Sequence, residues 1–88
     1  MPNPRQYIFP VAFRHIENEE LIGVINGANV MFQTNNNFIS GHVHIYLNGL
    51  KLRPGVGNDY VELSENTIQM NYAPMSGDVI IADYLRKS

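Results

Sequence analysis

The sequence contains no cysteine and few charged residues of either sign. The absence of cysteine excludes a disulfide scaffold, a thiolate nucleophile and a cysteine-type zinc site. Six Lys and Arg residues stand against eight Asp and Glu residues, mostly scattered singly, and the formal net charge is -2. Because no basic patch results, we expect neither a nucleic-acid partner nor a membrane partner.

Long apolar runs are also missing. No run approaches the ~20 residues that a membrane-spanning helix needs. Residues 1–10 have neither the basic region nor the apolar region of a secretory signal peptide. We therefore expect a soluble protein that is synthesised in the cytoplasm.

A chain of 88 residues has room for one domain. A domain of this size buries only about 60–65% of the surface that its unfolded chain exposes. Without disulfides it depends on close packing, tight turns or a partner, so we expect a homo-oligomer.

Asparagine, glycine and proline recur along the chain and favour turns between short strands. Residues 42–47 alternate polar and apolar side chains, as do residues 50–53, and Asn48-Gly49 between them is typical of a type I′ hairpin turn. A second hairpin is predicted around Asn26-Gly27. The strand predicted at residues 79–84 is apolar on both faces through Ala82, which indicates a central or interface strand.

About seven short strands, spaced about 8–12 residues apart, predict an all-β protein with a single small antiparallel β-sandwich. The pattern places four aromatic side chains in the core or between strands, namely Phe32, Tyr60, Tyr72 and Tyr84.

The N-terminal segment is apolar on both faces, although Pro10 cannot donate a hydrogen bond to a strand ladder. It is either a first edge strand of the domain or an arm that docks on a neighbouring subunit. We accordingly divide the chain into an arm or edge strand at residues 1–19 and a β-sandwich module at residues 20–88. The candidate partner-binding residues are Tyr7, Ile8, Phe9, Val11 and Phe13.

His42 and His44 are two residues apart and therefore lie on one face of a strand, a spacing that metal enzymes use. A catalytic zinc site needs a third ligand, for which His15, Glu17 or Asp83 would have to converge through the fold. A polar, solvent-facing strand is the favoured interpretation, with no metal and no cofactor.

The remaining polar residues give no catalytic motif, and we expect a protein that is not an enzyme. No G-x-S-x-G sequence is present. A paired-carboxylate site is an alternative that the sequence leaves open, because folding can bring together any two of the carboxylates of Asp59, Glu62, Asp78 and Asp83. Asp59 and Asp78 follow turn residues, and we interpret them as side chains that bind turn backbone.

From residue 20 onward the chain resembles the small β-sandwich module of structural proteins of tailed bacteriophages. The resemblance covers about three quarters of the chain. It rests on Glu20, Gly23, Asn26-Gly27, Asn29, Phe32, Thr34, residues 43–50 (VHIYLNGL), Asp59-Tyr60, Ile68, Ala73-Pro74, Gly77-Asp78 and Asp83-Tyr84.

The resemblance implies a non-enzymatic virion structural protein whose partners are other virion proteins of the capsid or tail. It implies a capsid decoration or cement subunit, or a small tail, neck or fibre component, located in the virion. The alternative is a receptor-binding or glycan-binding module of a tail appendage, with a possible ligand face at His42, His44 and Tyr46.

Overall fold

The computed structural model describes residues 13–87, and every regular element among them is a β-strand. The strands are β1 Phe13–Glu20, β2 Met31–Gln33, β3 Phe38–Leu47, β4 Leu50–Lys51, β5 Tyr60–Glu62, β6 Thr67–Met70 and β7 Ile80–Lys87. The described residues hold no helix that could cross a membrane.

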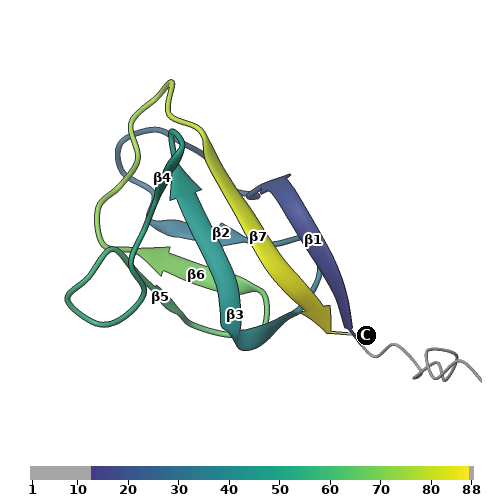
Figure 1. Cartoon of the computed structure of the whole chain (residues 1–88). Coiled ribbons are helices and arrows are strands. Elements are labelled where there is room, and N and C mark those ends of the chain that lie inside the picture. The colour runs from purple at the N-terminus through teal and green to yellow at the C-terminus, as the bar shows by residue number, and fades with distance from the viewer. Residues whose placement is uncertain (1–12, 88) are drawn as a thin grey trace, which may run out of the picture.

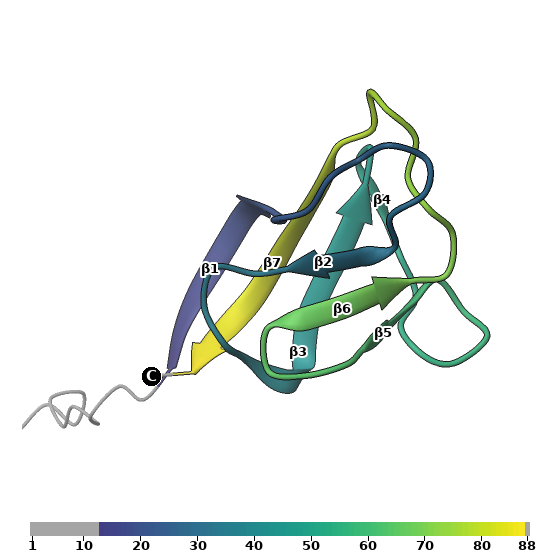
Figure 2. The same ribbon diagram turned by 180° about the vertical axis from the view of Figure 1, so that it is seen from behind.

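The strands form a four-stranded sheet in the order β1-β7-β3-β4 and a three-stranded sheet in the order β2-β6-β5. All pairs are antiparallel. The two sheets lie face to face (Figures 1 and 2). This arrangement confirms the all-β fold and is consistent with the predicted small sandwich.

The core lies between the two sheets, because alternate residues of each strand point inward. Its buried apolar side chains are Leu21, Phe32, Phe38, Val43, Ile45, Tyr60, Ile68, Met70, Ile80, Ala82 and Tyr84. The core positions of Phe32, Tyr60 and Tyr84 are confirmed. The core position of Tyr72 is wrong: β6 ends at Met70, and Tyr72 lies in the following loop with 75% of its surface exposed.

The predicted hairpin at Asn48-Gly49 is confirmed. Leu47 of β3 pairs with Leu50 of β4. Asn48 and Gly49 have φ angles of 51° and 87°, and a type I′ turn requires positive φ at both central residues. The register is therefore set locally by the turn.

β7 is a central strand, as its apolar pattern predicted. It pairs with β1 on one side and with β3 on the other. Ile80, Ala82 and Tyr84 are buried in the core, while Ile81 is half-buried on the opposite face.

The predicted hairpin at Asn26-Gly27 is wrong. The backbones of the two flanking segments pair only at Ile22 and Gln33, through two hydrogen bonds of 2.8 and 2.9 Å. Between them the chain makes a wide loop. The Asn26 side chain accepts hydrogen bonds from the N–H groups of Ala28 and Asn29, and β2 takes β6 as its strand partner.

Two side chains of β5 connect the sheets. The Tyr60 hydroxyl donates to the Val43 carbonyl at 3.0 Å. The Glu62 carboxylate accepts hydrogen bonds from the Ser40 hydroxyl at 2.9 Å and from the Gly41 N–H at 3.0 and 3.2 Å. The bonds to the Val43 carbonyl and the Gly41 N–H satisfy backbone groups of β3 in the part of the strand that β4 does not reach.

Ionisation of the Tyr60 phenol lowers the stability of the folded protein at alkaline pH. Burial, together with the negative charge of Glu62, raises the pKa of Tyr60 from 10.0 to about 12. Because the folded pKa lies above the unfolded pKa, this group's contribution to stability is complete below pH 10.0 and is lost as the pH rises to about 12.

We expect urea denaturation of the wild-type protein to show a falling free energy of unfolding across this interval. The Tyr60→Phe variant should be about 1 kcal/mol less stable at neutral pH and lose less stability in alkali. Tyr84, whose pKa burial also raises, accounts for part of the remaining fall. The matched control is Tyr72→Phe, which changes an exposed phenol and should behave as the wild type does. Equal alkaline losses in the two variants would contradict this assignment.

Candidate interaction surfaces

The predicted arm lies mostly outside the described residues, which exclude Tyr7, Ile8, Phe9 and Val11. Phe13 is the first residue of β1, and its backbone pairs with that of Lys87 at the end of β7. β1 therefore begins at the end of the sandwich where β7 ends (Figure 1). Edge strand β1, residues 13–20, extends across the division that we placed between residues 19 and 20.

The free edge of β1 is poorly suited to pairing with a further strand. A bulge interrupts its register between Ile16 and Glu19, and Asn18 within it has a φ of 58°. The strand also carries several charged side chains. Bulges and charges are the devices by which natural sheets prevent edge-to-edge pairing.

The histidine pair lies on the outer face of the four-stranded sheet. His42 and His44 are exposed, Tyr46 is half-buried, and His44 is the cross-strand neighbour of Asp83. The three possible ligand residues therefore follow one strand and share one face.

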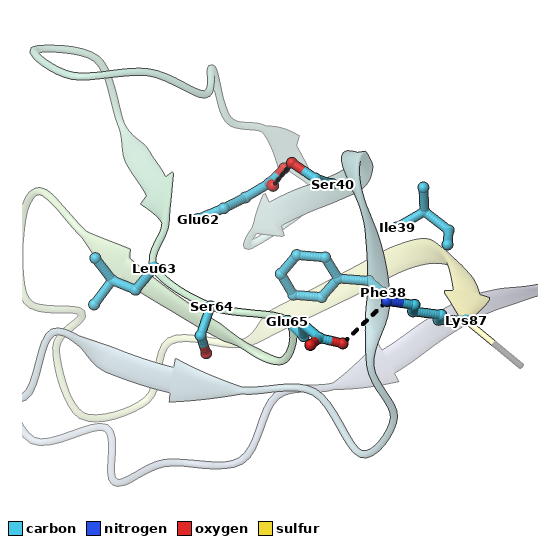
Figure 3. A pocket seen from close by; sticks show the side chains of 8 residues that line it. All are labelled: Phe38, Ile39, Ser40, Glu62, Leu63, Ser64, Glu65 and Lys87. Carbon is cyan, nitrogen blue, oxygen red and sulfur yellow. Dashed lines mark hydrogen bonds and ion pairs between the residues drawn. The ribbon is translucent and has the colours of Figure 1, made fainter.

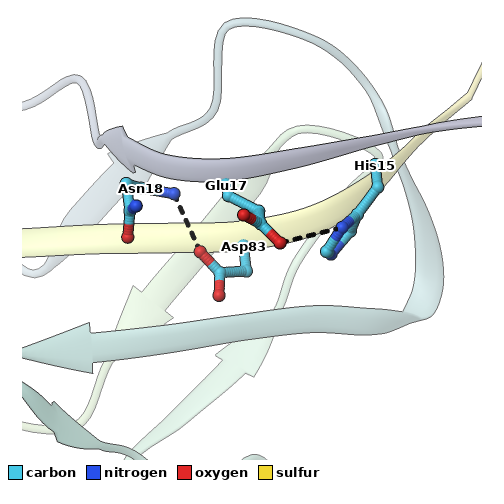
Figure 4. Close-up of polar contacts among 4 residues, drawn as sticks. All are labelled: His15, Glu17, Asn18 and Asp83. Carbon is cyan, nitrogen blue, oxygen red and sulfur yellow. Dashed lines mark hydrogen bonds and ion pairs between the residues drawn. The ribbon is translucent and has the colours of Figure 1, made fainter.

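Of the other suggested metal ligands, Asp83 lies on the adjacent strand β7, and His15 and Glu17 lie one strand further away on β1 (Figure 4). His15 Nδ1 is 3.2 Å from a Glu17 carboxylate oxygen, and the Asn18 N–H donates to Asp83 at 2.8 Å. Within residues 13–87 no group of three or more His, Cys, Asp or Glu side chains is placed to hold a metal ion.

The interpretation of Asp59 and Asp78 as residues that bind turn backbone is confirmed. Asp59 accepts a hydrogen bond from the Arg53 N–H at 2.8 Å. Asp78 accepts from the Asn48 side-chain amide at 3.0 Å and from the Met75 N–H at 2.8 Å. Both bonds favour the charged carboxylate, the bond from Asn48 more than the bond from Met75, and they therefore lower the pKa of Asp78.

A groove of about 360 Å³ opens between β3 and the turn that joins β5 to β6 (Figure 3). The bond between Ser40 and Glu62 lies on one side of it, and an ion pair of 3.4 Å between Lys87 and Glu65 lies on the other. The lining residues are Phe38, Ile39, Ser40, Glu62, Leu63, Ser64, Glu65 and Lys87. Sequence reasoning missed this groove, because it depends on a register shift in β3 between Phe38 and Val43.

The outer face of the three-stranded sheet differs from that of the other sheet because it has no charged side chain. The residues of β2, β6 and β5 that alternate with the core residues are Met31, Gln33, Thr67, Gln69 and Val61. Ile22 pairs with Gln33 at one border, and the Leu63 N–H donates to the Thr67 carbonyl at the other. We call these seven residues the neutral face.

The structure thus defines a small two-sheet β-protein with three surface features that partners could contact, namely the histidine face, the groove and the neutral face. No family model matches this chain, and neither a curated protein nor a solved structure shows significant similarity to it.

Proposed function

We propose that this chain is a non-enzymatic structural subunit of a tailed-bacteriophage virion. Its place is the virion, as a capsid decoration or cement subunit or as a small component of the tail, neck or fibre. It docks there on other virion proteins. The proposal begins from the resemblance of residues 20–84 to the β-sandwich module of such proteins.

The observation that supports this proposal is the position of the motif residues in the fold. Asn48-Gly49 makes a hairpin turn, and Asp59 and Asp78 bind turn backbone. Tyr60 and Tyr84 are buried between the sheets. A motif whose residues maintain a scaffold is what we expect of a module that is reused at several places in a virion.

Docking would follow from ordinary interface physics. Burial of the apolar side chains at residues 7–11 would contribute about 25 cal/mol per Å² of apolar area removed from water. The ordering of the segment and the association itself oppose this gain. Many copies on one particle supply avidity, so each contact can be weak.

Purified virions carrying an arm variant test the proposal. We expect the wild-type chain to copurify with particles at a fixed copy number relative to the major capsid protein. The double variant Tyr7→Asp/Phe9→Asp should lose most of this incorporation, because two apolar contacts are replaced by charges that must be desolvated.

The matched control is Gln6→Asp, which adds a charge beside the apolar residues without removing one of them and should be incorporated. Absence of the wild-type chain from purified virions would refute the virion role. Normal incorporation of the double variant would refute docking through the arm.

A further inference from the structure

The neutral face bears three exposed apolar side chains, with Ile22 49%, Met31 42% and Leu63 48% exposed. These three side chains border the polar but uncharged Gln33, Thr67 and Gln69. From Leu21 to Leu50 the chain contains no Asp, Glu, Lys or Arg, and β6 contains none either.

The opposite surface of the molecule is different in kind. The outer face of the four-stranded sheet bears Glu17, Asp83 and Lys51, together with the exposed His15 and His44. A patch that combines apolar side chains with uncharged amides, on a protein whose other faces are charged, is typical of a protein interface.

The chemistry of the face favours an identical copy as the occupant. Each copy carries a net charge of -2, so two copies repel each other least when they make contact through a face that bears no charge. Glutamine both donates and accepts hydrogen bonds, so an amide surface can pair with itself. A two-fold axis brings the same surface patch of both copies together, and a residue meets its own counterpart only at the axis.

We propose that the neutral face is the site at which a second copy of this chain binds, sheet against sheet, with Gln69 close to the two-fold axis. Gln69 is the central residue of this face, because its cross-strand neighbours are Met31 on one side and Val61 on the other. This inference deepens the proposed function and rests on it for its biological role, since it names one partner of the structural subunit.

The size of the face predicts a weak association. The neutral face consists of three strands that are a few residues long and about 4.8 Å apart, so its surface area is roughly a few hundred Å². Stable complexes bury about 800 Å² of surface on each partner. We therefore expect a dimer that forms at high concentration in solution and is favoured where copies are held close together.

Sedimentation equilibrium of the full chain, up to about 1 mM, tests the proposal through a charge exchange at Gln69. Gln69→Lys alone and Gln69→Glu alone place like charges beside the axis and should each weaken association by about tenfold or more. An equal mixture of the two variants should regain association, because opposite charges then meet.

The matched control is His44→Lys, which adds the same charge to the exposed face of the other sheet and should dimerise as the wild type does. Gln33→Lys, also on the neutral face, serves if Gln69→Lys fails to fold by circular dichroism. A wild-type chain that stays monomeric at the highest concentration would overturn the proposal. So would variants that associate normally, a mixture no better than its components, or an equal loss in His44→Lys.

Failure here and failure of the proposed function are distinguishable. The charge exchange concerns self-association of the purified chain, whereas the arm variant concerns incorporation into particles. A chain that dimerises through the neutral face but is absent from virions would retain this inference and refute the virion role.

Discussion

The Gly23→Ala variant is expected to unfold at a much lower urea concentration than the wild type, with a loss of about 3 kcal/mol or more. A Cβ atom on Gly23 would lie 2.5 Å from Phe32 Cδ2 and 3.0 Å from the Met31 carbonyl oxygen. Gly23 also has a φ of 153°, which L-residues rarely adopt. Because Phe32 is fully buried, its ring cannot move away without disturbing the core.

The matched control for this variant is Gly57→Ala. Gly57 also has a positive φ, of 83°, but nothing lies within 4 Å of the position that its Cβ would take. It should therefore lose about 1 kcal/mol from backbone strain alone. Equal losses in the two variants would show that the contact with Phe32 is not the cause.

The second large effect is expected for Phe32→Ala, which should lose about 3–5 kcal/mol of stability. Phe32 is the central residue of β2 and has no exposed surface. Its removal leaves a cavity between the sheets that the short strands around it can only partly close. Chemical denaturation monitored by circular dichroism measures this loss, and Met31→Ala, on the exposed side of the same strand, is the control.

The two changes should not be additive, because residues 23 and 32 are in contact. In the Gly23→Ala/Phe32→Ala double variant the added methyl group projects into the space that the ring has left. We expect the double variant to be more stable than the sum of the two losses predicts, by about 1 kcal/mol or more. Strict additivity would contradict the contact between these residues.

The two Asn-Gly dipeptides show what local sequence can and cannot predict. Asn48-Gly49 lies between alternating segments that pair with each other, so the dipeptide forms the predicted turn. Asn26-Gly27 is the same dipeptide, yet the Gly27 N–H donates to the Pro74 carbonyl, 47 positions further along by residue number (74 − 27), at 2.8 Å. A contact so distant in sequence competes with the local turn, and no local pattern reveals it.

The candidate sites were likewise predictable only where they depend on the local sequence of one strand. Alternation along β3 predicted that His42 and His44 share a solvent-facing surface, and both are exposed. Nothing in the sequence predicted that Glu62 would bind Ser40 and Gly41, because this contact joins a strand of one sheet to a bulge in the other. The groove and the neutral face both follow from how the sheets are assembled, so sequence reasoning found neither.

By itself, the sequence determined that this protein is built from short strands, that Phe32, Tyr60 and Tyr84 face the core and where one hairpin turns. These properties follow from the period of two along a strand and from the φ angles of Asn and Gly, which act over a few residues. Only the tertiary structure decided that β2 pairs with β6 and that β7 lies between β1 and β3. Those pairings join distant segments through the shared burial of apolar faces, and they leave the three-stranded sheet with an outer face that bears no charge.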